Sequence, residues 1–260
     1  MELPPGFDKS IALEAASLVN QAYDQYQHFV KQVPWSLQGD YDNLGVLAAK
    51  PDVLFARKEP FGFVARNKTT RDLFVTFRGT ESLEDWLTDF TFPQEVHPWG
   101  KVEDGFAHVY NQCSADVRSF VQAGATPGAR NPANVFVTGH SLGGALATLA
   151  TADLVASGAA PQAAMYSFAS PRVGDRPFAR EFDKRVPQRW RVANTEDIVT
   201  CLPLATVTLL HPRSIFGLRL MLSRSFEYQH VGIPLSFTTH NGSIPANHAM
   251  QVYIDALKAA

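Results

Sequence analysis

The stretch Val135-Phe-Val-Thr-Gly-His-Ser-Leu-Gly-Gly144 decides the fold. Its apolar run over 135–138 predicts a buried strand, and the Ala-rich run over 142–157 predicts a helix. Between them lies a Gly-x-Ser-x-Gly pattern, and a turn from strand to helix is the context in which this pattern presents a nucleophilic serine. Glycines on both sides remove side chains that would collide in the turn, so the Ser141 hydroxyl should stand clear at the helix N-terminus, where negative charge is favoured. The pattern therefore predicts a nucleophile at Ser141 rather than a packing turn with an incidental serine.

Strands and helices alternate after this turn, which implies parallel strands with right-handed crossovers. Before it, three β-rich runs include two joined by a polar turn, which suggests a hairpin and an antiparallel start to the sheet. The expected fold is therefore an α/β-hydrolase fold, with a mixed, mostly parallel sheet flanked by helices. The remaining predicted elements are helices over 10–30, 106–124 and 176–185, strands over 164–168 and 189–192, and β-rich runs over 53–57, 61–66 and 73–77.

Length and composition limit the domain count and the partners. A chain of 260 residues with 45% hydrophobic residues can bury one substantial core. No repeat, low-complexity tract or linker-like run divides it, so we expect a single domain over 1–260. The 23 Lys and Arg residues nearly balance the 25 Asp and Glu residues, which gives a net charge of -2. Because this balance leaves no global field, a nucleic-acid partner is not expected.

The chain begins with neither the basic start nor the apolar run of a secretory signal, and no later stretch is long enough to span a bilayer. A cytoplasmic location is the default expectation, and a secreted one applies if a signal has been removed. Cys113 and Cys201 lie far apart and match no metal-ligand spacing, which favours two unpaired core thiols and leaves a single bridge as the alternative. No metal or organic cofactor is expected, and the sequence does not decide the oligomeric state.

A serine nucleophile requires an orienting carboxylate and a histidine base, which in this fold follow it in the order serine, acid, histidine. Asp197 lies in the loop just after the strand over 189–192, where a catalytic acid is expected, and Glu196 is its near rival. The other candidate carboxylates lie on or at the start of predicted helices and should face solvent; they are Asp153, Asp175 and Asp183.

Four histidines follow the candidate acid: His211, His230, His240 and His248. His230 alternates with aromatic residues in a strand-like run, which favours a structural, hydrogen-bonded role. Position favours His240 and His248, because both lie between the last predicted strand and the last helix. The residues by themselves do not choose between these two.

Several blocks in a fixed order make the chain resemble the class 3 lipases, the family of the filamentous-fungal triacylglycerol lipases and their plant and bacterial relatives. The resemblance runs from about residue 74 to residue 253, and the set of blocks is far more specific than any one of them. The blocks are Val75-Thr-Phe-Arg-Gly-Thr80, Asp85-Trp86-Leu-Thr-Asp89, Asp104-Gly105-Phe106, Val137-Thr-Gly-His-Ser-Leu-Gly-Gly144, Phe168-Ala-Ser-Pro-Arg-Val-Gly174, Asn194-Thr-Glu-Asp-Ile-Val199, His230-Val-Gly232 and His248-Ala-Met-Gln-Val-Tyr253.

The resemblance implies roles for particular residues. It implies that Asp197 is the catalytic acid and His248 the catalytic histidine. It assigns one oxyanion donor to Thr80, through its backbone N–H and hydroxyl, and the turn geometry assigns the other to the backbone N–H of Leu142. The chain departs from the family pattern at Glu103, where the family usually has a structural histidine, and this leaves the packing of that loop open.

The implied activity is that of a triacylglycerol lipase or esterase that works through an acyl-enzyme on an ester lipid, and a lipid–water interface is the setting that this activity implies. Phospholipid, galactolipid and feruloyl esters are alternative substrates within the family. A non-catalytic signalling module is less favoured, because the full set Thr80, Ser141, Asp197 and His248 is present. A serine peptidase or acyltransferase shares the triad chemistry, but the lipase-type blocks disfavour it.

Two apolar stretches could contact lipid. The resembling lipases carry a lid after the oxyanion residue, which makes Trp86, Phe90 and Phe92 the candidate lid residues. Core packing is the alternative, favoured for Trp86 and not for the two phenylalanines. The leucine-rich stretch over 202–222, with interspersed arginines, could rest on a lipid surface or form a buried helix with snorkelling arginines.

Overall fold

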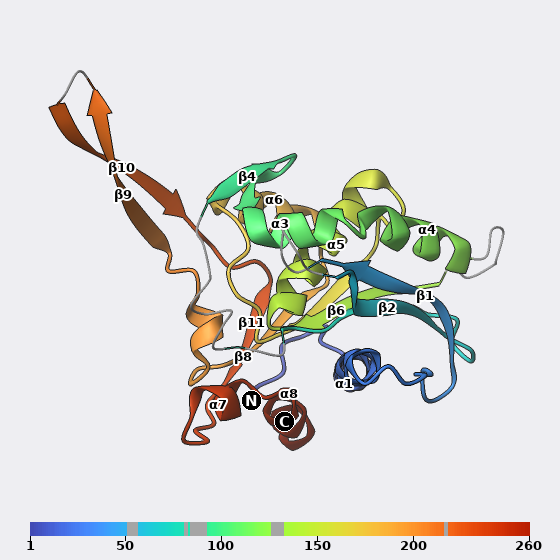
Figure 1. Cartoon of the computed structure of the whole chain (residues 1–260). Coiled ribbons are helices and arrows are strands. Elements are labelled where there is room, and N and C mark those ends of the chain that lie inside the picture. Colours follow the sequence, from blue (N-terminus) through green and yellow to red (C-terminus); the bar gives the residue numbers. More distant parts are fainter. Residues whose placement is uncertain (51–56, 81–82, 84–92, 126–132, 216–217) are drawn as a thin grey trace.

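The structure is a computed structural model that describes residues 1–50, 57–80, 83, 93–125, 133–215 and 218–260, with the backbone alone over 210–215 and 218–222. Within these ranges the main sheet has seven strands in the order β1-β2-β3-β6-β7-β8-β11 (Figure 1). The strands are β1 (Tyr41–Ala49), β2 (Glu59–Asn67), β3 (Leu73–Phe77), β6 (Val135–His140), β7 (Ala164–Phe168), β8 (Arg189–Asn194) and β11 (Ile233–Phe237).

The direction of the strands changes at β3. The pairs β1–β2 and β2–β3 are antiparallel, whereas β3–β6, β6–β7, β7–β8 and β8–β11 are parallel. The antiparallel start and the hairpin before β3 are therefore confirmed. The mixed, mostly parallel sheet confirms the α/β-hydrolase fold. The strand β1 was not predicted, because its sequence is polar at one end and only its last residues are buried.

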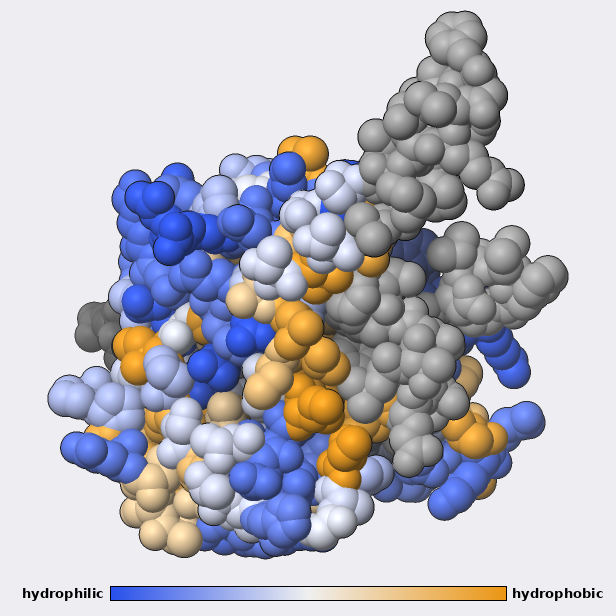
Figure 2. Space-filling view, turned by 90° about the vertical axis from the view of Figure 1, so that its left-hand side faces the viewer, coloured by the Kyte–Doolittle hydropathy of each residue, from blue (hydrophilic) through white to orange (hydrophobic). Residues whose placement is uncertain are grey.

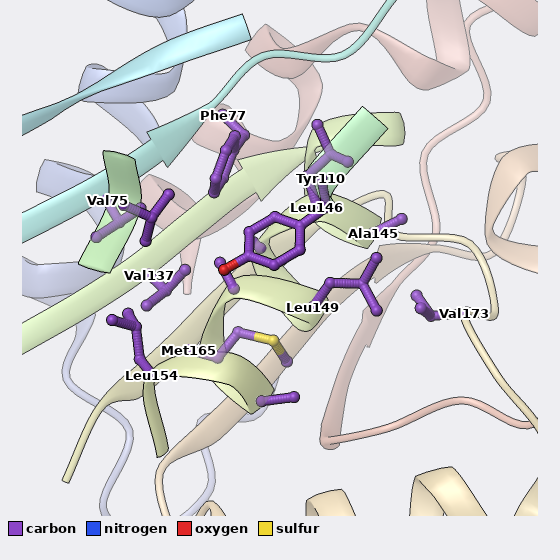
Figure 3. Close-up of a cluster of buried hydrophobic side chains, with 14 of the residues drawn as sticks. Val75, Phe77, Tyr110, Val137, Ala145, Leu146, Leu149, Leu154, Met165 and Val173 are labelled. Carbon is purple, nitrogen blue, oxygen red and sulfur yellow. The ribbon is translucent and has the colours of Figure 1, made fainter. Parts of the chain in front are cut away.

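Helices cover both faces of the sheet (Figure 1). Strand residues alternate between the two faces, so Val75 and Phe77 join one apolar cluster and Phe74 joins the other. Figure 3 shows the first cluster, in which Leu146 and Leu149 of α5 lie against the sheet. One face carries α1 (Lys9–Val30) and α8 (Met250–Ala259), and the other carries α3 (Asp104–Asn111), α4 (Ser114–Gly124), α5 (Leu142–Ser157) and α6 (Arg176–Arg185).

The single helix predicted over 106–124 is wrong, because the chain forms two helices there, α3 and α4. The break falls at Gln112 and Cys113, which cap the two helices. The Gln112 side chain accepts from the Lys50 backbone N–H at 3.0 Å and donates to the Lys50 carbonyl at 3.1 Å. These two bonds fasten the turn to the end of β1, a contact that the local pattern could not reveal.

The buried helix considered for residues 202–222 is also wrong. The stretch enters a two-stranded antiparallel hairpin of β9 (Thr206–Ile215) and β10 (Leu218–Glu227), which projects from the body of the molecule (Figure 1). Every residue of the two strands pairs, from Thr206 with Glu227 to Ile215 with Leu218. Contact of this hairpin with lipid stays a prediction.

Several smaller findings complete the fold. Both cysteines are unpaired, as favoured, but Cys113 is buried and Cys201 is exposed, so only Cys113 is a core thiol. In the described part of the chain no helix is both long and apolar enough to cross a bilayer. Residues 53–56 of the first predicted β-rich run lie outside the described residues. The elements not yet named are β4 (Gln94–His97), β5 (Gly100–Glu103), the short helix η1 (Ile198–Cys201) and α7 (Ile244–His248).

Candidate active site

Ser141 stands at the turn between β6 and α5 with a left-handed backbone, at φ 59° and ψ −129°. Such a conformation is costly for a residue other than glycine, so the surroundings must hold it. The Ser141 N–H donates to the Phe168 carbonyl at 3.0 Å, which ties the turn to β7. Gly139 is required as well, because a Cβ there would lie 2.0 Å from the Gly143 carbonyl oxygen. The strained turn predicted from the sequence is therefore present.

Asp197 and His248 form a buried pair. The Nδ1 atom of His248 lies 2.7 Å from Oδ2 of Asp197, and the two side chains are 8% and 0% exposed. The carboxylate is held by two further donors, since Tyr253 donates its hydroxyl to Oδ2 at 2.5 Å and the Val199 N–H donates to Oδ1 at 3.0 Å. Because the carboxylate accepts from Nδ1–H, the Nε2 atom of His248 keeps a lone pair that can take a proton.

The Oγ atom of Ser141 and the Nε2 atom of His248 are both buried, and neither has a hydrogen-bond partner among the described residues. The candidate nucleophile and the candidate base are therefore not hydrogen-bonded to each other in this structure. Catalytic hydrogen bonds are commonly long or misaligned in the absence of substrate and tighten when it binds. Buried, unpartnered polar atoms are costly, so two of them at one site point to a site kept ready for a ligand.

The rival acid and histidine form a second pair on the surface. His240 Nδ1 lies 3.2 Å from Glu196 Oε2, and the two side chains are 69% and 42% exposed. His230 is structural, because its Nε2 atom lies 2.8 Å from the Thr200 carbonyl and burial, the largest cause, lowers its pKa to about 3. The side chain of His211 lies outside the described residues.

The helix-associated carboxylates are engaged in structural contacts instead of facing water freely. Asp153 accepts from the Tyr110 hydroxyl and pairs with Arg118, and Asp183 pairs with Arg189. Asp175 caps α6.

The candidate oxyanion donors come from two neighbouring segments. Leu142 is the first residue of α5, where backbone N–H groups have no partner within the helix. Thr80 is partly buried two residues after Arg78, whose side chain anchors the segment. The Arg78 guanidinium donates to the carbonyls of Pro60 and Gly79 at 2.8 and 2.7 Å and to Glu59 at 2.6 Å. Arg78 is 1% exposed, so the arginine of the Arg-Gly-Thr block serves to position the segment.

Glu103, the departure from the family pattern, also has a structural place. Its Oε2 atom accepts from the Phe106 N–H at 2.7 Å and so caps α3. The side chain is buried, and burial raises its pKa from 4.5 to about 8. The packing of this loop, which the sequence did not predict, is thus fixed by Glu103 as the N-terminal cap of α3.

A cavity of about 320 Å³ opens beside the buried pair. Its lining combines side-chain amides with apolar side chains, and this mixture suits the polar and apolar ends of an ester. Its lining includes Asn20, Tyr23, Thr80, Leu83, Met250 and Gln251, together with His140 and His248. Trp86, Phe90 and Phe92, the candidate lid, lie outside the described residues. Within the described ranges no three His, Cys, Asp or Glu side chains gather so that they could hold a metal ion.

Two residues of the site were missed in the sequence. Tyr253 ends the block from His248 to Tyr253 and lies on the last helix, five residues after His248. This spacing is the signal that could have indicated its contact with Asp197. Tyr23 gave no signal, because it lies on α1, far from every block.

Comparison with known proteins identifies the family. A family model described as Lipase (class 3) matches residues 74–207, just over half of the 260 residues. The chain is 35% identical over 146 residues to a secreted mono- and diacylglycerol lipase 1 of Fusarium solani, with 54% of this chain and 42% of the relative covered. It is 31% identical over 230 residues to a phospholipase A1 of Oryza sativa subsp. indica, with 76% and 50% covered.

Among solved structures, one of a triacylglycerol lipase with a serine protease triad at its catalytic centre matches with a TM-score of 0.61 and 26% identity, over 74% of each chain. The chain spans about half the length of the curated relatives it matches, at 42% and 50% of the two named above. The matched region includes the turn at Ser141 and the candidate acid Asp197, and the fold agrees with that of a solved lipase. This chain belongs to the class 3 lipase family.

Proposed function

We propose that this protein is a serine hydrolase that cuts the carboxylic esters of lipids through an acyl-enzyme. The observation that carries the proposal is the buried Asp197–His248 pair, in which His248 Nε2 has no hydrogen-bond partner among the described residues. The Oγ atom of Ser141 is likewise buried and has no partner among these residues. A histidine oriented by a carboxylate is the base that a serine nucleophile needs. The strained turn at Ser141 supports the same role.

In the proposed mechanism Ser141 Oγ attacks the ester carbonyl carbon while His248 Nε2 takes its proton. The negative charge that develops on the carbonyl oxygen is bound by the backbone N–H groups of Thr80 and Leu142 and by the Thr80 hydroxyl. Asp197 stabilises the imidazolium, which then gives its proton to the leaving alcohol. Water, activated by the same histidine, attacks the acyl-enzyme and releases the carboxylic acid and free Ser141.

The proposed substrate is an acylglycerol. The Fusarium relative is named a mono- and diacylglycerol lipase, and the solved structure is that of a triacylglycerol lipase. The cavity beside His248 offers the amides of Asn20 and Gln251, which can hydrogen-bond an uncharged glycerol moiety, next to apolar Leu83 and Met250.

Apolar surface near the site supports a lipid substrate. Figure 2 views the side of the molecule that carries η1 and α7, and apolar residues form a band on it. Ile198 of η1, Leu204 after it and Ile244 of α7 are 43%, 60% and 45% exposed. These positions flank Asp197 and His248 in the chain, so an ester presented at a lipid surface would meet apolar side chains near the site.

Phospholipid is the second candidate substrate. The phospholipase A1 of Oryza sativa matches over the larger share of this chain, 76% against 54% for the Fusarium lipase. The names of the two relatives disagree on location as well, since one is called secreted and the other chloroplastic or mitochondrial. The compartment of this chain stays a prediction.

The test of the catalytic proposal is the Ser141→Ala variant. We expect it to lose both ester hydrolysis and covalent labelling by a fluorophosphonate, with an unchanged far-UV circular dichroism spectrum. Labelling that persists in the folded variant would show that the nucleophile is another residue. A panel of triacylglycerol, phospholipid, galactolipid, feruloyl and p-nitrophenyl esters, with Ser141→Ala as the blank for each, then identifies the substrate class.

A further inference from the structure

A chain of hydrogen bonds adjoins the cavity of the candidate active site and joins four distant segments. The Gly79 backbone N–H donates to the Tyr23 hydroxyl oxygen at 3.0 Å. The same hydroxyl lies 2.8 Å from Nδ1 of His140, and Nε2 of His140 lies 2.8 Å from the backbone carbonyl oxygen of His248. Tyr23 is on α1, 117 residues before His140, so only the fold brings these groups together.

The proton positions along this chain follow from its two ends. A carbonyl oxygen only accepts, so Nε2 of His140 must carry the proton that it donates to His248. Burial, the largest cause, and the nearby His248 hold the pKa of His140 well below its usual value, so the ring is neutral and Nδ1 is an acceptor. Tyr23 therefore donates to Nδ1, and its oxygen accepts from Gly79. The direction of every hydrogen bond in the chain is thus fixed.

Each end of this chain, and its middle, adjoins a residue of the proposed machinery. Gly79 precedes Thr80, His140 precedes Ser141, and the carbonyl at the far end belongs to His248 itself. Packing reinforces the bonds, since a Cβ at Gly79 would lie 2.5 Å from the Tyr23 hydroxyl and 2.7 Å from Cβ of Ser141. The rings of His140 and His248 lie with centroids 4.6 Å apart.

We propose that Tyr23 is a positioning residue for ester hydrolysis: its hydroxyl holds the oxyanion segment directly at Gly79 and, through the His140 ring, holds the main chain of His248, so that both stay in register with Ser141. The inference rests on the proposed function, since it gives these two residues a role in that reaction. Nucleophile, base and oxyanion donors come from three separate segments, and displacements of about 1 Å among such groups cost on the order of a hundredfold in rate. A shared hydrogen-bonded tie is a direct way to keep the three segments aligned.

The first test is Tyr23→Phe, which keeps the ring and removes only the hydroxyl. We expect kcat on a soluble p-nitrophenyl ester to fall by about tenfold to a hundredfold, with KM changed by less than about threefold, because the lost group aligns the transition state. The rate of fluorophosphonate labelling of Ser141 should fall in parallel, since the same nucleophile and base act in that reaction.

The matched control is Tyr110→Phe. Tyr110 is a buried tyrosine whose hydroxyl donates to Asp153 at 2.7 Å, and it lies outside the cavity beside His248. The Tyr110→Phe variant should lower the melting temperature by about as much as Tyr23→Phe does, and it should leave kcat unchanged. If both variants lose kcat equally, or if Tyr23→Phe changes KM alone, the positioning role is overturned.

Substitutions at His140 test whether the two residues act together. His140→Gln keeps one donor and one acceptor and should retain more of the rate than His140→Leu, which has neither. The double variant Tyr23→Phe, His140→Leu should be no slower than His140→Leu alone, because both substitutions break the same chain of hydrogen bonds. Fully additive losses in the double variant would refute the shared chain. Failure of the proposed function is a separate outcome, since Ser141→Ala would then keep its activity.

Discussion

Glu196 and Asp197 are neighbours in the chain, yet their side chains lie in opposite environments. Asp197 is buried with three donors, whereas Glu196 reaches a histidine on the surface. An exposed pair between such groups is solvated and screened, so it fixes neither partner in place. Burial, and not the type of residue, separates the proposed acid and base from the pair beside them.

This difference predicts the behaviour of two histidine variants. His248→Ala should lose several orders of magnitude in kcat, on the order of the cost of removing a triad member, while His240→Ala should keep most of the activity. Steady-state kinetics on a soluble ester checks both. The reverse outcome would place the base in the surface pair.

Glu103 predicts a pH dependence of stability. Because its pKa is raised in the folded state from 4.5 to about 8, chiefly by burial with nearby Asp104 adding to the rise, the fold favours the protonated carboxyl. Its contribution is therefore complete below about pH 4.5 and declines as the pH rises through about 8. Glu103→Gln keeps an oxygen for the Phe106 N–H and does not ionise.

The melting temperature of Glu103→Gln should accordingly exceed that of the parent by roughly 3–8 °C at pH 9, with a much smaller difference at pH 5. Thermal unfolding of both proteins across this range measures it. A difference that is constant with pH would mean that Glu103 does not titrate in this window.

At the scale of elements, the turn between β6 and α5 works through close backbone contact with the end of β3. A Cβ at Gly143 would lie 2.5 Å from the carbonyl oxygens of both Phe77 and Arg78. Helix α5 can therefore start directly beside the segment that leads to Thr80 only because position 143 has no side chain. The glycines of the turn bring the segments of the two candidate oxyanion donors together and also leave room for the strained backbone of Ser141.

Gly143→Ala should thus push the two segments apart and reduce kcat by about a hundredfold, with a smaller effect on the melting temperature than on the rate. Gly158→Asn is the control at the other end of α5, because its Cβ would meet nothing within 4 Å and asparagine tolerates the left-handed backbone there. Kinetics of the two variants side by side checks this. A Gly143→Ala enzyme of normal rate would mean that the donors lie elsewhere.

At the scale of the whole molecule, the exposed apolar side chains near the site predict a difference between substrates. Ile244→Ser should weaken hydrolysis of an emulsified long-chain acylglycerol by about threefold to tenfold and leave a soluble short-chain p-nitrophenyl ester unaffected, because only the first is met at a surface. Val46→Ser is the matched control, since Val46 is 43% exposed on β1 and Ile244 is 45% exposed. If both variants slow hydrolysis of the emulsified substrate equally, Ile244 on α7 has no specific role in contact with the lipid surface.

The sequence by itself determined the parts of this protein that depend on short-range patterns. The run from Val135 to Gly144 predicted strand, turn and helix, because sterics within the turn require glycines around Ser141. Alternation of strands and helices predicted the sheet, since right-handed crossovers leave few other arrangements. The order of the blocks implied that Asp197 is the catalytic acid and His248 the catalytic histidine, a choice that the residues alone had left open against Glu196 and His240.

Only the tertiary structure decided what depends on contacts between distant segments. The break between α3 and α4 follows from the bonds of Gln112 to Lys50, and the strands of the β9–β10 hairpin follow from pairing along their whole length. The tie from Tyr23 through His140 to His248 has no trace in any local pattern, because hydrogen bonds across 117 and 108 residues exist only once the chain has folded. Burial acts in the same way, and it made one of two adjacent carboxylates the candidate partner of the base.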